Sequence, residues 1–146
     1  FQWVNRECRT DDGGYWYMSP MGMLRNHTTY CAAANGAGLQ TPAAEGAKCA
    51  LWRLVRHCYD PSQKSPLYGC RPWNFVHDQF LLMIPEDGWM HERVLAMEQD
   101  AVYGMKQVVT DVVVRVESCL MRRWSKKAKP VKDADGRLQV WEEKTA

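Results

Sequence analysis

The chain has 146 residues, with 19 lysines and arginines against 17 acidic residues and a formal net charge of +2. This length suits one domain with a sizeable core, and the nearly balanced charge gives no overall sign of nucleic-acid binding. No apolar stretch is long enough to span a bilayer and no secretory signal opens the chain, so we expect no membrane partner. The six cysteines form no CxxC pair, which favours free thiols in a reducing compartment over a disulfide or zinc scaffold.

Residues 1–30 are expected to form an irregular N-terminal segment. Turn signals occur at Asp11–Gly14 and Ser19–Gly22, so we expect short extended pieces joined by tight turns. Arg25 adds a hydrogen-bonding cation near the end of this segment.

Residues 31–60 are expected to be helical. The stretch before Thr41 is rich in small residues, and Gly36 and Gly38 argue against a continuous helix across it. Thr41 is the predicted N-cap, and Asp60 is expected to end the helix. Apolar residues recur at three- and four-residue steps and predict one buried stripe: Ala43, Ala47, Ala50, Leu51, Leu54 and Cys58.

An apolar run broken by a polar triplet predicts a β-hairpin over residues 72–85. Both flanks are rich in β-formers, and the triplet His77, Asp78 and Gln79 indicates a tight turn. Such a hairpin holds the carboxylate of Asp78 at its tip, where it can face solvent, a metal ion or a phosphate. Because Asp is also a common turn residue, a purely structural role is the alternative.

A second helix is expected over residues 88–110, with Asp87 as its cap. The β-branched stretch 111–117 predicts a strand, and the tail to residue 146 is basic around 122–132, with another short strand at 138–141. The chain is therefore expected to be a single α+β domain, an antiparallel sheet with helices packed on one face.

Three stretches resemble the C-terminal part of the palm of family A DNA polymerases, the DNA polymerase I type. Val76–Gln79 is similar to the motif C hairpin, which usually reads V-H-D-E. Asn35–Lys48 resembles the family's N-x-x-x-Q-G-x-A-A-D segment, and Ser118–Val131 resembles the closing segment of phage-like members. The three occur in the family's order and cover most of the chain between Tyr30 and Val131.

The resemblance implies a palm-type sheet and nucleotidyl transfer with two Mg²⁺ ions, in the cytoplasm of a bacterial or phage-infected cell. It implies that Asp78 is a catalytic metal ligand and that His77 supports the hairpin tip and the primer end. Asn35 and Gln40 are then minor-groove contacts to primer-template DNA, and a dNTP is the second substrate. The alternative for these two amides is local hydrogen bonding at the entry to the helix. The remaining expected DNA contacts are Arg25, Gln79, Arg122 and Arg123.

The sequence also departs from the family pattern. Gln79 stands where the family usually has Glu, which removes one charge from the metal region, and Asn35 and Gln40 are one residue further apart than usual. Motif A, with the other catalytic Asp, and motif B, which holds the triphosphate, are not recognised. We therefore expect no polymerisation by this chain alone, and expect a second chain or a preceding region to supply both motifs.

Two other functions remain open from the sequence. His77-Asp78 is also the dipeptide of HD-type metal phosphohydrolases, which would require helical backbone at His77. Alternatively, the chain is a non-catalytic module that binds DNA or a polymerase chain through its basic tail.

Overall fold

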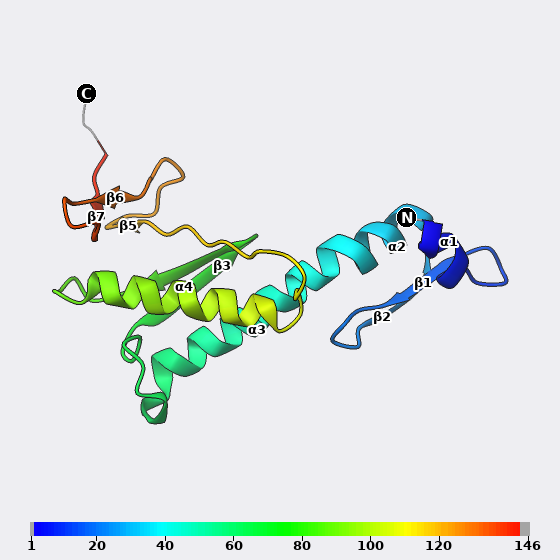
Figure 1. Cartoon of the computed structure of the whole chain (residues 1–146), viewed down its shortest axis with the longest axis horizontal. Coiled ribbons are helices and arrows are strands. Elements are labelled where there is room, and N and C mark those ends of the chain that lie inside the picture. The colour runs from blue at the N-terminus through cyan, green and yellow to red at the C-terminus, as the bar shows by residue number, and fades with distance from the viewer. Residues whose placement is uncertain (1, 144–146) are drawn as a thin grey trace. The chain divides into compact units, whose positions relative to one another are not determined.

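The structure is a computed structural model that describes residues 2–143. It divides into two compact units, one of residues 2–50 with 103–113 and one of residues 51–102 with 114–143. Helices α3 (Thr41–Tyr59) and α4 (Met90–Lys106) contribute residues to both units, so the expectation of a single domain stays a prediction. Figure 1 shows the elements in chain order. None of the described helices combines the length and the apolar character that crossing a membrane requires.

The first unit begins with α1 (Gln2–Glu7) and an antiparallel pair, β1 (Tyr15–Met18) and β2 (Leu24–Thr28). The turn expected at Ser19–Gly22 is present and joins these two strands, and Gly22 takes the positive φ of 87° that glycine tolerates best. The core of this unit is small: Val4, Cys8, Tyr17, Ala33 and Ala34.

The helical segment is longer than the sequence predicted. Helix α2 (Tyr30–Asn35), a π turn (Gly36–Gln40) and α3 follow one another without interruption. The expected break at the glycines is wrong, and so is Thr41 as an N-cap, because Thr41 has helical φ and ψ of −70° and −48°. The cap of the continuous segment is Thr29, whose side chain accepts a hydrogen bond from the Ala32 N–H at 3.3 Å.

Glycines allow α3 and α4 to approach closely inside the first unit. Gly104 faces the backbone of Ala50 so closely that a Cβ there would overlap it, and a Cβ on Gly46 would lie 2.9 Å from Sδ of Met105. These positions carry glycine because a neighbouring helix occupies the space of a side chain.

In the second unit, α3 ends at Tyr59, as the Asp60-Pro61 sequence predicted, and Asp60 then caps the short 3₁₀ helix Pro61–Gln63. A hairpin follows, β3 (Arg71–Val76) with β4 (Gln79–Met83), and confirms the hairpin prediction. Its partly buried Phe80 and Leu82 pack on a core that includes Leu54 and Leu67. The helices therefore cover one face of the hairpin (Figure 1).

The C-terminal strands form a separate small sheet in the order β5-β7-β6, from β5 (Leu120–Met121), β6 (Val131–Lys132) and β7 (Leu138–Trp141). β7 confirms the strand expected at 138–141. The described chain is thus mixed helix and strand, an α+β arrangement, with three small sheets. Antiparallel pairs dominate them, but β5 and β7 run parallel.

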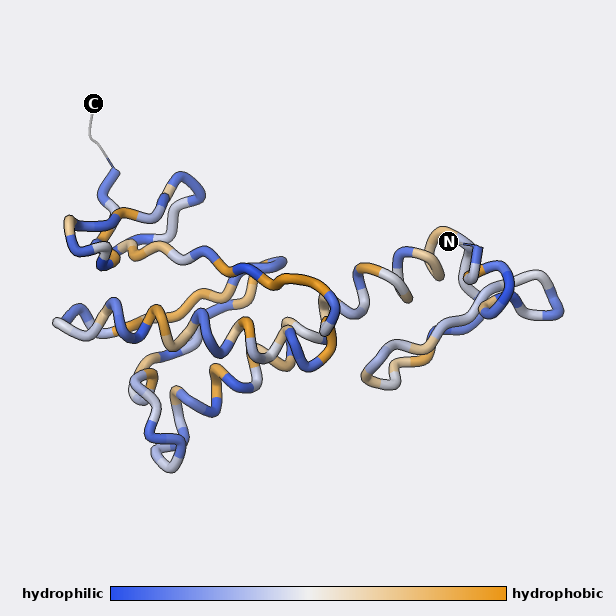
Figure 2. Tube along the Cα trace, viewed as in Figure 1, coloured by the Kyte–Doolittle hydropathy of each residue, from blue (hydrophilic) through white to orange (hydrophobic). Residues whose placement is uncertain are grey.

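The strand expected over residues 111–117 is wrong. This stretch has no regular secondary structure, and Val113 is 81% exposed although Figure 2 shows the region as hydrophobic. β-Branched residues favour a strand only where another strand offers hydrogen bonds, and here no neighbouring strand pairs with the segment.

Candidate functional site

The β3–β4 hairpin closes with a two-residue loop. Val76 pairs with Gln79, and Phe75 pairs with Phe80, so only His77 and Asp78 lie between the strands. The rings of Phe75 and Phe80 stack with centroids 4.9 Å apart, which fixes the strands next to the loop. The tight turn is confirmed, but Gln79 belongs to β4 rather than to the turn itself.

His77 adopts a left-handed backbone conformation with φ of 57°. A positive φ is uncommon for residues other than glycine, although histidine adopts it more often than most. The turn therefore holds His77 in a conformation that a non-glycine residue adopts at some cost. This geometry is not helical, so the condition for an HD-type phosphohydrolase is not met at His77.

Asp78 is exposed at the tip, and its carboxylate makes no hydrogen bond or ion pair with any residue in the range 2–143. By contrast, Asp87 and Asp100 in the same unit are each bound to an arginine. A ligand can therefore reach Asp78 without displacing a protein partner.

The described residues alone do not complete a metal site. No group of three His, Cys, Asp or Glu side chains lies close enough together within residues 2–143 to hold an ion. Mg²⁺ is commonly held by one or two carboxylates together with substrate phosphates and water. Asp78 fits the role of one such carboxylate, and the other protein ligands would have to come from elsewhere.

The remaining residues predicted to contact DNA fall in two places. His77 and Gln79 flank Asp78 at the hairpin tip, in the second unit. Arg25 on β2, Asn35 at the end of α2 and Gln40 at the end of the π turn belong to the first unit, and all three side chains are exposed. The structure thus brings together only the tip residues as one local site.

Arg122 and Arg123 differ in whether their guanidinium groups are free to bind a DNA phosphate. Arg122 contacts Glu86 at 2.6 Å and Glu142 at 2.7 Å, and these hydrogen bonds raise the pKa of its guanidinium above the usual value. Arg123 is exposed and forms no ion pair with residues 2–143. A DNA phosphate that binds Arg122 would therefore compete with two carboxylates. A phosphate that binds Arg123 would meet no such competition from residues 2–143.

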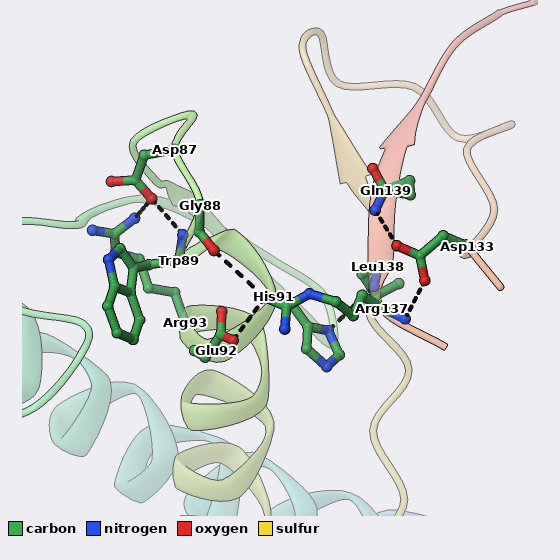
Figure 3. A network of polar contacts seen from close by, with 10 residues as sticks. All are labelled: Asp87, Gly88, Trp89, His91, Glu92, Arg93, Asp133, Arg137, Leu138 and Gln139. Carbon is green, nitrogen blue, oxygen red and sulfur yellow. Dashed lines mark hydrogen bonds and ion pairs between the residues drawn. The ribbon is translucent and has the colours of Figure 1, made fainter. Parts of the chain in front are cut away.

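The sequence did not predict the polar network that joins α4 to the C-terminal sheet (Figure 3). Arg137 donates to Glu92 at 2.7 Å, and Nδ1 of His91 accepts the backbone N–H of Leu138 at 3.2 Å. These partners are more than 40 residues apart in sequence, so no local pattern could reveal them. The contacts hold β7 against the start of α4.

An apolar cavity of about 530 Å³ lies between the hairpin, α4 and β5 in the second unit. Met90, Met97 and Met121 contribute to its lining, as do two exposed tryptophans, Trp73 and Trp124. The cavity contains neither Asp78 nor its neighbours in the turn, so it is separate from the hairpin tip.

Comparison with known proteins identifies no relative: no family model, no curated protein and no solved structure matches this chain.

Proposed function

We propose that this chain is the C-terminal palm portion of a family A DNA polymerase, with Asp78 as one of its catalytic metal ligands. The observation that carries the proposal is the carboxylate of Asp78, exposed and without a described partner at the tip of a two-residue hairpin. The resemblance of Val76–Asp78 to the family's V-H-D tip supports the proposal, and Gln79 is the position that differs from it. The setting would be the cytoplasm of a bacterial or phage-infected cell.

The hairpin suits this role because it limits movement of the carboxylate. The Phe75–Phe80 stack and the packed face of β4 anchor the strands, and only two residues lie beyond the last pair. A ligand held to within a fraction of an ångström is what two-metal catalysis requires. When bound, the Mg²⁺ ions activate the primer 3′-hydroxyl and neutralise charge on the pyrophosphate leaving group.

The neighbours of Asp78 would contact the primer end. His77 lies beside Asp78 in the turn, and its imidazole can donate to a phosphate or sugar oxygen. Gln79 offers a neutral amide, which hydrogen-bonds but adds no negative charge near the ions. The Glu that the family usually has at this position would add a negative charge there.

The proposal requires residues from outside the described site. A second carboxylate and the cations that hold the dNTP triphosphate would come from another chain or another part of the polymerase. The substrates are primer-template DNA and a dNTP.

Primer extension with Mg²⁺ tests the proposal. The assay compares this chain alone, the chain mixed with a co-encoded chain that carries motifs A and B, and the same mixture with Asp78→Asn. We expect extension only in the mixture, lost with Asp78→Asn and kept with Asp135→Asn, a matched change in another exposed turn. Extension by this chain alone, or no extension in the mixture, contradicts the proposal.

A non-catalytic DNA-binding or polymerase-partner module is the second candidate, and the basic C-terminal region favours it. Arg123, Lys126, Lys129 and Lys132 are all exposed there, and Gln79 lowers the negative charge at the tip. Binding through these cations predicts a steep fall in DNA affinity with salt. Steep salt dependence combined with no extension in any mixture would support this candidate.

A further inference from the structure

The apolar cavity of the second unit is lined by residue types that are typical of protein interfaces. Four of the chain's eight methionines line it: Met83, Met90, Met97 and Met121. Two exposed tryptophans line it as well. Methionine adapts its shape to different partners, and both residue types are enriched at protein–protein interfaces. The volume of about 530 Å³ falls within the ordinary range of ligand-binding pockets.

The hairpin presents Trp73 to this cavity through a β-bulge. Pro72 pairs with Leu82, and Asn74 pairs with Leu81, so Trp73 is an extra residue without a partner in the ladder. A bulge of this kind re-aims a side chain, and Trp73 lines the cavity while it stays 61% exposed. Trp124 lines the same cavity and is 45% exposed. The fold therefore leaves a large aromatic surface open beside the cavity, where a partner can bury it.

The charged side chains of the lining, Glu86 and Arg122, satisfy one another. Nη2 and Nε of Arg122 donate to the two carboxylate oxygens of Glu86 at 2.6 and 3.3 Å. A nucleobase in this cavity would lose its hydrogen bonds to water without gaining new ones from the apolar walls. Aliphatic and aromatic side chains have no such hydrogen bonds to lose, so they fit the cavity better.

One wall of the cavity belongs to a strongly basic part of the chain. Residues 118–132 contain six lysines and arginines and no acidic residue. Arg122 and Lys127 form ion pairs with glutamates. The other four are exposed and form no ion pair with residues 2–143: Arg123, Lys126, Lys129 and Lys132. Because these cations extend over residues 123–132, several carboxylates complement them better than the single head group of a fatty acid would.

We propose that the apolar cavity is a docking site for an acidic amphipathic segment of a partner protein. Bulky apolar side chains of the segment enter the cavity beside Trp73 and Trp124, and its carboxylates pair with the exposed cations of residues 123–132. The hairpin tip takes no part in this contact, so the inference does not depend on the polymerase function. A failed extension assay would leave it standing.

Fluorescence anisotropy of the full chain with labelled peptides tests this chemistry. The probe is a synthetic peptide of about 16 residues with leucine and phenylalanine at helical spacing and glutamate on the opposite face. One control peptide replaces every glutamate with glutamine, and the other replaces every leucine and phenylalanine with serine. We expect saturable binding of the glutamate peptide and at least about 10-fold weaker binding of either control. No binding of the glutamate peptide, or equal affinity for it and either control, overturns the proposal.

Variants of the chain test which residues make the contact. Trp73→Ala should weaken binding of the glutamate peptide at least about 10-fold, as expected for an aromatic anchor, without changing the melting temperature. Trp89→Ala is the matched control, because Trp89 is 64% exposed in the same unit but does not line the cavity. Arg123→Gln should weaken the glutamate peptide about 3-fold and leave the glutamine peptide unchanged. Equal effects of the two tryptophan variants, or of Arg123→Gln on the two peptides, overturn the proposal.

NMR of the methionine methyl groups locates the bound peptide. The glutamate peptide should shift the signals of the four cavity methionines but not those of the four in the first unit, Met18, Met21, Met23 and Met105. Shifts in the first unit without shifts at the cavity would place the contact elsewhere and contradict the proposal. Laurate and a thymidine oligonucleotide test for a fatty acid and for single-stranded nucleic acid. If either binds more tightly than the glutamate peptide and shifts the cavity methionines, the proposed occupant is wrong.

Discussion

The side chain of Asp100, only 5% exposed, lies 2.6 Å from Nδ1 of His57 through its Oδ2 atom. Its other oxygen accepts a hydrogen bond from Nε of Arg53 at 2.6 Å. One buried carboxylate of α4 therefore binds two side chains from consecutive turns of α3. Such a charge is tolerated in the interior because Arg53 hydrogen-bonds one of its oxygens and the imidazole of His57 lies against the other, which has no hydrogen-bond partner within residues 2–143.

Removing this carboxylate should destabilise the protein strongly. Asp100→Ala leaves His57 without its partner in a largely buried position, so we expect a loss of about 3 kcal/mol in the free energy of unfolding, measured in urea. Glu7→Ala removes the exposed Arg6–Glu7 pair and should cost less than about 1 kcal/mol. Equal costs for the two variants would show that the Asp100 cluster does not hold the helices together.

The contact between Gly104 and Ala50 predicts a steric effect. Gly104→Ala places a Cβ against the backbone of Ala50, which cannot move as a flexible side chain could, so we expect a loss of at least about 2 kcal/mol. Gly88→Ala is the matched control, because a Cβ there meets no atom within 4 Å and should change stability by less than about 0.5 kcal/mol. Urea unfolding of both variants measures the difference, and a neutral Gly104→Ala would contradict the close crossing.

Substitutions of His77 can distinguish the effect of backbone strain from the function of the side chain, because the φ of this residue is positive. His77→Gly relieves the left-handed conformation and should leave the free energy of unfolding unchanged or higher, whereas the β-branched His77→Val should lower it by about 1–2 kcal/mol. If the imidazole supports the primer end, His77→Gly should nonetheless slow extension in the active mixture. A stable His77→Gly variant with full extension activity would limit His77 to a role in the turn.

The hydrogen bonds of Asp60 should make part of the protein's stability depend on pH in the acidic range. Hydrogen bonds from Ser62, followed by Gln63, lower the pKa of Asp60 from 3.8 to about 2. Because the folded-state pKa is lowered, this contribution is fully present above about pH 4 and is lost as the pH falls toward 2. The melting temperature of Asp60→Asn should therefore fall less than that of the parent chain between pH 4 and pH 2. Parallel curves for the two proteins would contradict the assigned hydrogen bonds.

The sequence predicted the elements whose signals are local. The Asp60-Pro61 stop, the hairpin around His77–Asp78 and the strand at 138–141 each depend on neighbouring residues, and each is confirmed. The buried stripe of α3 is confirmed at Ala50, Leu54 and Cys58 but not at Ala43, which is exposed. At this end of α3 the buried side instead carries Thr41, Glu45 and Gly46, so the helix does pack there but on a different face from the predicted stripe.

The errors have non-local causes. Gly36 predicts a break in the helix, but the ring of Tyr17 fills the space beside it and a π turn continues the helix into α3. The stretch 111–117 has strand composition but no pairing partner. Within the candidate site, the position of Asp78 at the hairpin tip was predictable from the local turn sequence. The ion pairs of Arg122 were not, because its partners Glu86 and Glu142 are 36 and 20 residues away.

The most direct test of the central claim is the extension rate of the mixed assembly as a function of Mg²⁺ concentration, with duplex affinity measured in parallel. If Asp78 is a metal ligand, Asp78→Asn should reduce the rate at saturating Mg²⁺ by at least about 100-fold while the dissociation constant for primer-template stays within twofold of the parent value. The Asp135→Asn control should match the parent in both measurements. An Asp78→Asn rate within twofold of the parent would contradict the claim that this hairpin carries a catalytic carboxylate.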